Sequence, residues 1–370
     1  MREIPATWMR GGTSKCWVFR RADLDVPGMS VDDVLLRLYG SPDLRQVDGV
    51  GGGTSTTSKA VILAQSTAPE VDVDYTFAQV GIEDAKVDWG SNCGNCSAVV
   101  AAFAIREGWV RTRQGETPVR VRNTNTDQLI VQHVPTPGGR LLEEPTIAIP
   151  GVSFLGAPVR MGFVDPAGRS TGRLFPTGRR RDLVPCDEHR SIEVTLVDAG
   201  APVVAVPAVA LGLTGGEEPA AIEAVPGLLA ALDRVRRAAG VLMGMAPEPR
   251  QVARAVPKLA LVAAAVDREA HLSVRMLSMG RVHPAVPITG SVALTLAATA
   301  PGTVVHDLVG ADVDPSAGLR IDTPAGRVQT FVEQLDGVPV VGAIRTYRRL
   351  ASGLLLLPDP PLQPSAPVAV

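Results

Sequence analysis

The chain has 370 residues, 45% of them hydrophobic, and a formal net charge of −2. This length allows two domains with cores of their own, and so small a net charge gives no reason to expect nucleic acid or an anionic membrane as a partner. Four cysteines in a chain of this size favour a reducing cytoplasm over a disulfide framework. The start lacks the apolar core of a signal peptide, and the apolar runs are too short to span a bilayer, so we expect neither secretion nor a membrane partner.

In chain order, the first predicted element is a hairpin or a strand with a kinked turn. Residues 4–10 have strand character, the segment Gly11-Gly12-Thr13-Ser14-Lys15 interrupts the strand, and residues 16–19 resume it. We expect the interrupting turn to expose backbone amides. A short helix follows at residues 31–38, with Ser30 as its N-terminal cap and two aspartates in its first turn.

A second glycine-rich stretch covers residues 48–59 and ends in Ser58-Lys59. A phosphate-binding P-loop needs Gly-Lys-Ser/Thr at the start of a helix, whereas Ser58-Lys59 leads into an apolar run with strand character. A dinucleotide fingerprint is excluded as well, because no G-x-G-x-x-G lies between a strand and a helix. The strand signal that follows at once also disfavours a flexible linker. We therefore expect a polar loop that offers amides, hydroxyls and the Lys59 ammonium group to an anion.

The polar turn around Cys93 is the centre of the predicted organisation. Residues 71–80 alternate apolar and polar like a half-buried strand and lead towards it. After Asn92, Cys93, Gly94 and Asn95, an almost wholly apolar run predicts a buried helix over about residues 95–106. Cys93 would then lie beside the unpaired amides of this helix, a setting that binds anions and favours a thiolate. The alternative is that Cys93 and Cys96 are merely small buried residues.

The rest of the chain predicts two domains. Strand-like segments at residues 119–124 and 129–134 complete an antiparallel sheet with one long helix. Residues 176–190 are polar and charged, and their arginines predict a solvated linker between domains at residues 1–182 and 183–357. The alanine- and leucine-rich residues 219–245 predict one or two helices. The proline-rich tail at residues 358–370 is expected to be disordered.

The order of elements in residues 71–104 recurs in residues 270–300. Each stretch has a strand, a polar loop, a turn of small residues and a buried apolar helix; the second turn is Thr289-Gly290-Ser291, opening a helix at about residues 289–300. This repetition predicts a tandem duplication of two similar α+β domains, each wrapping a sheet around one helix. Residues 343–350 are expected to return to the first domain's sheet. A cleft between two helix N-termini would suit a multi-carboxylate ligand.

Four motifs in this order resemble one known family: Met9-Arg-Gly-Gly-Thr-Ser-Lys15, Gly52-Gly-Thr-Ser-Thr-Thr-Ser-Lys59, Asn92-Cys-Gly-Asn95 and Met276-Leu-Ser-Met-Gly-Arg281. From about residue 4 to residue 349, the chain resembles the 2-methylaconitate cis–trans isomerases, with the related methylitaconate Δ-isomerases and 4-oxalomesaconate tautomerases. The resemblance implies the diaminopimelate epimerase-like fold. That fold has two pseudo-symmetric domains, each with a curled, mostly antiparallel sheet around a central helix, and the site lies between them.

The resemblance also implies an activity and roles for single residues. The family's enzymes shift a proton within the allylic system of an unsaturated di- or tricarboxylate, such as 2-methylaconitate, aconitate, methylitaconate or 4-oxalomesaconate. Lys59 and Cys93 match its active-site lysine and cysteine. The substrate-cradling turns correspond to Thr13, Ser14, Asn92, Gly94, Asn95, Thr289, Gly290 and Ser291. Within or beside the same motifs lie four residues without an assigned role: Lys15, Ser58, Met279 and His283.

Such a proton shift needs a positioned acid and base and stabilisation of the enolate-like charge that develops. Either Lys59 or Cys93 could be the base. Neither a cofactor nor a metal is expected, since the five histidines are scattered and no Cys/His spacing is that of a zinc site.

Three alternatives accompany this hypothesis. An epimerase or racemase on the same fold is disfavoured, because the amino-acid epimerases have a second cysteine where this chain has Thr289-Gly290-Ser291. A Cys-x-x-Cys redox protein and a non-catalytic accessory protein of a carboxylate pathway are the others. A small-molecule carboxylate is the expected partner, and a homodimer is left open.

Overall fold

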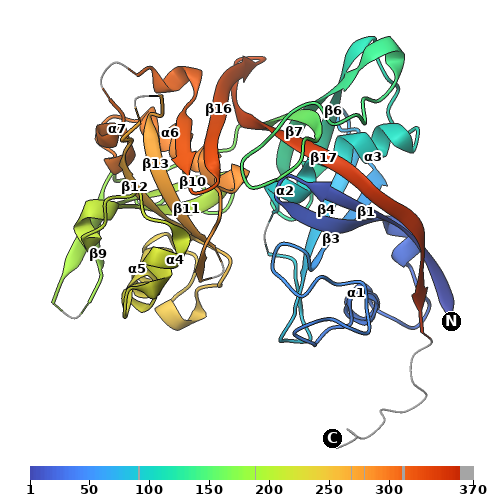
Figure 1. The fold of residues 1–370 in the computed structure, drawn as a ribbon, viewed down its shortest axis with the longest axis horizontal. Coiled ribbons are helices and arrows are strands. Elements are labelled where there is room, and N and C mark those ends of the chain that lie inside the picture. Colours follow the sequence, from blue (N-terminus) through green and yellow to red (C-terminus); the bar gives the residue numbers. More distant parts are fainter. Residues whose placement is uncertain (91, 188, 268, 279, 311–312, 359–370) are drawn as a thin grey trace, which may run out of the picture.

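The structure of the protein is a computed structural model that describes residues 1–358 except 91, 188, 268, 279 and 311–312. Figure 1 shows two lobes side by side, the first formed by the blue-to-green half of the chain and the second by the yellow-green-to-orange half. The red segment near the end of the chain crosses back from the second lobe to the first. Met279 and residues 359–370 of the predicted tail lie outside the described residues.

The strands of the first lobe close into a ring. They pair in the order β17–β1–β2–β3–β4–β6–β7–β8, and β8 pairs with β17 again, while the short β5 flanks β4. The strands are β1 (Arg2–Gly11), β2 (Ser14–Arg20), β3 (Lys59–Gln65), β4 (Val73–Val80), β5 (Val87–Asp88), β6 (Gly115–Asn123), β7 (Gln128–Thr136), β8 (Ala157–Val164) and β17 (Val338–Leu357). Ring closure leaves these strands no unpaired edge.

The strands of the second lobe form a curled sheet that joins the first through one pairing. The order is β9–β10–β11–β12–β13–β15–β16, with β14 beside β13, and β16 pairs with β17. These strands are β9 (Asp182–Pro185), β10 (Ser191–Ala199), β11 (Ala201–Pro207), β12 (Lys258–Ala264), β13 (Leu272–Ser278), β14 (Arg281–Val282), β15 (Arg320–Thr323) and β16 (Gly326–Leu335).

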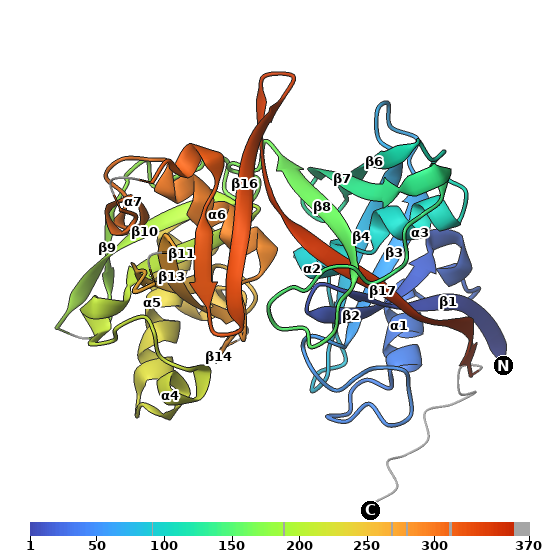
Figure 2. The same cartoon turned by 45° about the horizontal axis from the view of Figure 1, so that its top comes forward.

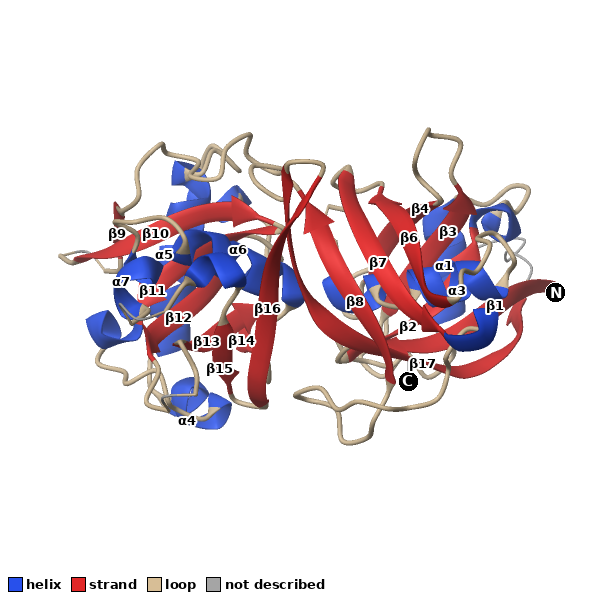
Figure 3. Cartoon of the chain, turned by 90° about the horizontal axis from the view of Figure 1, so that it is seen from above, coloured by secondary structure: helices blue, strands red, loops and turns tan. Residues whose placement is uncertain are grey.

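The two lobes repeat one pairing pattern. In the first, the antiparallel pairs β1–β2 and β3–β4 are linked by parallel β2–β3, and β4 then pairs in parallel with β6. In the second, the pairs β10–β11 and β12–β13 are linked by parallel β11–β12, and β13 pairs in parallel with β15. Figure 3 shows both sheets curled around helices. The predicted α+β class with two pseudo-symmetric, mostly antiparallel sheets is confirmed.

Helices fill both lobes. They are α1 (Val31–Tyr39), α2 (Gly94–Ser97), α3 (Val100–Arg106), α4 (Pro219–Ala224), α5 (Leu228–Leu242), α6 (Ile288–Ala298) and α7 (Val304–Leu308), with 3₁₀ turns η1 (Arg21–Leu24), η2 (Pro137–Gly139), η3 (Ala208–Leu211), η4 (Pro249–Gln251) and η5 (Pro315–Ala317). Every residue of α6 except Leu296 is buried, because its sequence is apolar on all sides. Ser30 caps α1 in a capping box with Asp33, and so the predicted cap is confirmed. Within the described residues, none of the helices combines the length and apolarity that a membrane crossing requires.

The side chain of Gln132, on β7, divides the first central helix. Its Nε2 donates to the Ser97 carbonyl at 2.8 Å, and its Oε1 accepts the Ala101 N–H at 3.1 Å. In an uninterrupted helix this N–H would donate to that carbonyl. Gln132 is inserted between the two groups, and the helix is interrupted there. The prediction of one continuous helix over residues 95–106 is therefore wrong.

The strand β17 ties the two lobes together. It contains the strand expected over residues 343–350 and pairs with β1 and β8 of the first lobe and with β16 of the second. Figure 2 shows β16 and β17 as a long hairpin that rises between the lobes. The chain therefore passes between its halves both before β10 and again at its last strand.

The predicted solvated linker over residues 176–190 is wrong. Part of it is β9, which pairs with β10, and Arg181 forms ion pairs with Glu193 and Asp307 of the second lobe. Earlier still, the Gly168 N–H donates to the Asp198 carbonyl at 2.8 Å. These contacts attach the chain to the second lobe ahead of residue 182. The division at residues 182 and 183 itself stays a prediction.

Replacing Gln132 by Met should lower the free energy of unfolding by about 1–3 kcal/mol, because buried backbone groups of α2 and α3 lose their partners. Urea denaturation followed by circular dichroism would measure it. The control is Gln334→Met, at an exposed position of β16, which should change stability by less than about 0.5 kcal/mol. Equal stability of Gln132→Met and the wild type would contradict the bridging role.

Candidate functional site

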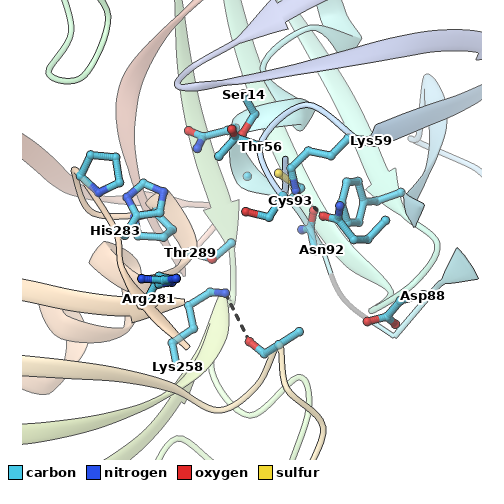
Figure 4. Close-up of a pocket in the computed structure, with 18 of the residues that line it drawn as sticks. Ser14, Thr56, Lys59, Asp88, Asn92, Cys93, Lys258, Arg281, His283 and Thr289 are labelled. Carbon is cyan, nitrogen blue, oxygen red and sulfur yellow. Dashed lines mark hydrogen bonds between the residues drawn. The ribbon is translucent and has the colours of Figure 1, made fainter. Parts of the chain in front are cut away.

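A pocket of about 280 Å³ lies between the two lobes, and residues of both line it (Figure 4). From the first half of the chain come Ser14, Ser55, Thr56, Lys59, Phe77, Gln79, Asp88, Asn92, Cys93, Gly94 and Asn95. The second half contributes Ala255, Lys258, Arg281, Val282, His283, Pro284, Pro287 and Thr289. The pocket thus joins the glycine-rich loop, the Cys93 turn and the start of α6, which are far apart in the sequence.

Lys59 is fixed at the first position of β3. Its backbone pairs with Gln79 on β4, and its Nζ donates to the Gln79 Oε1 at 2.7 Å. The same Nζ lies 4.8 Å from the centre of the Phe77 ring. The Tyr39 hydroxyl donates to the Lys59 carbonyl from α1. Neighbours on β4 and α1 therefore hold the amine and the backbone of Lys59 at the pocket wall.

Cys93 is the N-cap residue of α2, and its carbonyl accepts the Ser97 N–H at 2.9 Å and the Tyr75 hydroxyl at 3.2 Å. A hydrogen bond with the Cys96 side chain, followed by burial, raises the pKa of the Cys93 thiol well above its usual range. The charge of Lys59 opposes the shift without reversing it. The predicted thiolate is therefore wrong for this structure, because the second thiol and burial outweigh the helix start. Cys93 is therefore a protonated thiol that has a proton to donate.

The two asparagines of the turn have different partners. The Asn95 Nδ2 donates to the Thr13 Oγ1 at 2.9 Å, which docks the tip of the first hairpin on the helix start. Thr13 therefore supports the pocket wall without lining the pocket, whereas the neighbouring Ser14 lines it. The amide nitrogen and oxygen of Asn92 are buried and find no hydrogen-bond partner among the described residues. Buried polar groups are nearly always hydrogen-bonded, so Asn92 is available to a ligand.

The starts of the two central helices meet at Gly94. A Cβ on Gly94 would lie 2.0 Å from the Ile288 Cγ2, so a larger residue would force the helix starts apart. Thr289 lines the pocket beside this contact, whereas Gly290 and Ser291 do not. The predicted anion-binding amide of Ser291 is wrong, because it donates to the Pro287 carbonyl at 3.0 Å and closes the first turn of α6. The amides of residues 288–290 belong to the first turn and have no carbonyl partner inside the helix.

Two cationic groups of the pocket were not predicted from the sequence: Lys258 on β12 and Arg281 on β14. Burial lowers the pKa of Lys258 to about 8. Arg281 is mostly exposed and forms an ion pair with Glu223 at 3.0 Å. The scarcity of lysine was the available signal for Lys258, since the chain has only Lys15, Lys59 and Lys86 besides it. Polar neighbours of the Lys59 and Cys93 motifs were also missed: Ser55, Thr56, Gln79 and Asp88.

Of the four residues without an assigned role, one lines the pocket, two do not, and one lies outside the described residues. His283 lines the pocket, and burial lowers its pKa to about 4, so its ring is neutral near pH 7. Lys15 extends over the Trp8 ring, with Nζ 5.3 Å from the ring centre, and is not a lining residue. Ser58 is fully buried and donates to the Val80 carbonyl at 2.9 Å, a structural role. Met279 lies outside the described residues.

Cations outnumber anions in the lining. Among the described lining residues, Lys59, Lys258 and Arg281 face a single carboxylate, that of Asp88. In a partly buried site this arrangement attracts an anion with more than one negative charge. Among the described residues, no three His, Cys, Asp or Glu side chains are placed to hold a metal ion, and Cys93 alone of the cysteines lines the pocket.

Comparison with known proteins gives the family. A family profile described as "PrpF protein" matches residues 1–358. The chain belongs to the PrpF family. The (4E)-oxalomesaconate Delta-isomerase of Novosphingobium sp. (strain KA1) is 37% identical to it, over 96% of this chain and 98% of the relative. The 2-methyl-aconitate isomerase of Cupriavidus necator is 38% identical, over 90% and 91%. The resemblance stated from the motifs is confirmed.

Solved structures agree with the PrpF assignment. The crystal structure of a methylitaconate-delta-isomerase has a TM-score of 0.81 to this chain at 36% identity and covers 95% of each chain. A hydroxyproline epimerase from Agrobacterium vitis has a TM-score of 0.53 at 14% identity, covering 97% of this chain and 94% of its own. The second comparison concerns the fold alone. Together they confirm the epimerase-like fold expected for this PrpF chain.

The neutral, half-buried ring of His283 should make the protein less stable in mild acid. In the unfolded chain a histidine has a pKa of about 6.5. Below that pH the unfolded state binds the proton more readily than the folded state does. The free energy of unfolding therefore falls with falling pH until the pH reaches the pKa in the folded state, about 4. Between about pH 7 and pH 5 the wild type should lose about 2 kcal/mol more than His283→Gln. Urea denaturation at both pH values measures this, with His189→Gln at an exposed position as control. Equal losses in wild type and His283→Gln would refute the half-buried neutral ring.

Proposed function

We propose that this chain is a cofactor-independent isomerase that shifts a proton across the allylic system of an unsaturated di- or tricarboxylate. The observation that carries the proposal is the placement of Lys59 and Cys93 together in a pocket rich in cations between the lobes. Membership of the PrpF family supports it, since the relatives compared above are named as isomerases of 2-methyl-aconitate, (4E)-oxalomesaconate and methylitaconate. All four cysteines are free thiols, which supports a cytoplasmic location.

Substrate carboxylates would be held by neutral hydrogen-bond donors as well as by cations. The unpartnered amide of Asn92 and the hydroxyls of Ser14 and Thr289 lie in the pocket wall. The amides of residues 288–290, at the positive end of the eleven-residue helix α6, add donors for a carboxylate. We assign Thr13, Gly94 and Asn95 to shaping this wall, through their contacts with each other and with Ile288.

The proton transfer is assigned to Lys59 and Cys93. Lys59 first releases one proton to the solvent; its amine then takes the proton from one end of the allylic system, and the C–H electron pair becomes the new C=C bond. The former double bond gives its electrons to the other end, which takes the proton of the Cys93 thiol. The Lys59 ammonium then returns its proton to the Cys93 thiolate, so no proton is gained or lost. The raised pKa of Cys93 supports its role as the acid.

Electrostatic stabilisation of the intermediate would come from the same groups. As the proton leaves, negative charge spreads from the carbon onto the conjugated carboxylate or keto oxygen. Ammonium groups and helix amides already directed at that oxygen stabilise the charge without reorganising. A two-thiol epimerisation is not supported, because Thr289 stands where the second cysteine would be and Cys186 is buried in the core of the second lobe.

Tricarballylate, a saturated tricarboxylate that cannot undergo the allylic shift, should bind in the pocket and raise the melting temperature. Binding to the folded state alone stabilises by about 2.7 kcal/mol at a hundredfold excess over Kd. Differential scanning fluorimetry with tricarballylate, and with ATP at equal concentration as control, tests it. Stabilisation by ATP and by no di- or tricarboxylate would overturn the proposed substrate class.

Replacing Lys59 by Ala should lower kcat by about 10²–10⁴-fold, the usual contribution of a positioned base, without unfolding the protein. Cys93→Ser keeps the size of the side chain but is a much weaker acid, and should lower kcat strongly as well. Assays on 2-methylaconitate and 4-oxalomesaconate measure both, with Lys86→Ala at an exposed position as control. Turnover in D₂O should carry deuterium into an allylic carbon of the product. Full activity of both variants would contradict the assignment of proton transfer to Lys59 and Cys93.

A further inference from the structure

Lys258 is held in place by the middle of the second lobe's sheet. It is the first residue of β12, and its backbone pairs in parallel register with Val203 on β11, while β13 pairs along the other edge of β12. The side chain extends from this fixed point into the pocket. Figure 4 shows its amine on the opposite side of the pocket from Lys59 and Cys93.

The Lys258 amine has unused hydrogen-bonding capacity. An ammonium group carries three N–H donors, and the described residues offer it one long contact, 3.5 Å from the Ala255 carbonyl oxygen. None of the described carboxylates forms an ion pair with it, whereas the neighbouring Arg281 has Glu223. A partly buried cation without an anion loses solvation free energy, and no carboxylate among the described residues restores it. A carboxylate in the pocket would restore it.

Five titratable or charged side chains line the pocket with Lys258: Lys59 on β3, Asp88 on β5, Cys93 at the start of α2, Arg281 on β14 and His283 after it. Burial is the main cause of the lowered pKa of Lys258, about 8, and the charge of Lys59 adds to it. His283 is already neutral at that pH, and the pKa of Cys93 is raised well above its usual range. Loss of the Lys258 charge is therefore expected before the Cys93 thiol ionises.

We propose that Lys258 binds a carboxylate of the substrate from the second lobe and thereby positions the allylic carbons against Lys59 and Cys93. The inference rests on the proposed function, and it adds a charged contact from the second lobe to the neutral donors of α6. Lys59 and Cys93 belong to the first lobe only. A substrate bridged to Lys258 is held from both sides, which fixes its orientation as well as its affinity. Lys258 takes no proton from the substrate in this assignment.

Binding tests the contact directly. Isothermal titration calorimetry with tricarballylate near pH 7 should show a Kd about 10- to 100-fold higher for Lys258→Met than for the wild type, the effect of losing one charge-assisted hydrogen bond. Lys86→Met, at an exposed position, is the matched control and should bind like the wild type. Circular dichroism establishes that Lys258→Met is folded. Equal affinity of Lys258→Met and wild type overturns this inference, whereas no binding by the wild type overturns the proposed function.

Steady-state kinetics and the pH dependence of binding distinguish a role of Lys258 in substrate positioning from a role in proton transfer. Lys258→Met should raise KM for the isomerised substrate much more than it lowers kcat, since the proton-transfer groups remain. In the wild type, the Kd of tricarballylate should rise as the pH rises through about 8, because Lys258 loses its charge. Lys258→Arg keeps a charge at every accessible pH, so it should fold and bind tricarballylate with a Kd that stays level to higher pH. A rise in Kd at the same pH in both proteins, or a loss confined to kcat in Lys258→Met, overturns the assignment.

Discussion

The contact between Gly94 and Ile288 is the constraint on which the rest of the site depends. Two buried helices, one from each lobe, start against each other there, and the space that a Cβ on Gly94 would need is occupied by the Ile288 side chain. Each helix is held by its own sheet, the first through Gln132 and the second through a hydrogen bond of 2.9 Å between Thr295 and Thr330. The pocket is the polar space left beside this contact. Its shape is therefore set by apolar packing, while its chemistry is set by the turns around it.

The lining of this pocket carries more positive than negative charge. Lys59 and Lys258 approach from opposite lobes, and of the described side chains in the lining only Asp88 is negative. Burial disfavours a charged amine and lowers the pKa of Lys258 to about 8. The thiol of Cys93 does not offset the positive charge, because Cys96 and burial keep it protonated. A ligand with two or more carboxylates supplies the missing negative charge, and the site becomes electrostatically balanced only when that ligand is bound.

Much of the first lobe's contribution to the site could be predicted from local patterns. Cys93, Asn92 and Asn95 lie in a polar turn before an apolar run, and Lys59 ends a glycine-rich loop, so short stretches of sequence mark them as unusual. Lys258 has no such mark beyond being a lysine. It begins an ordinary apolar strand, and only the parallel pairing of β11 with β12 directs it to the pocket. The protonated state of Cys93 likewise follows from the approach of Cys96 and from burial, which the polar turn does not reveal.

The sequence by itself determined the local chemistry: where the chain turns, which helices are apolar on all sides, the repeated order of elements and the residues that match the family's motifs. These features depend on neighbours a few positions apart, through capping, backbone freedom and hydrophobic periodicity. Only the tertiary structure decided that Gln132 interrupts the first central helix, that Ser291 uses its amide within α6 and that Arg181 binds the second lobe. The reason is physical, because strand register and helix packing bring distant side chains together, and no local propensity specifies which of them meet.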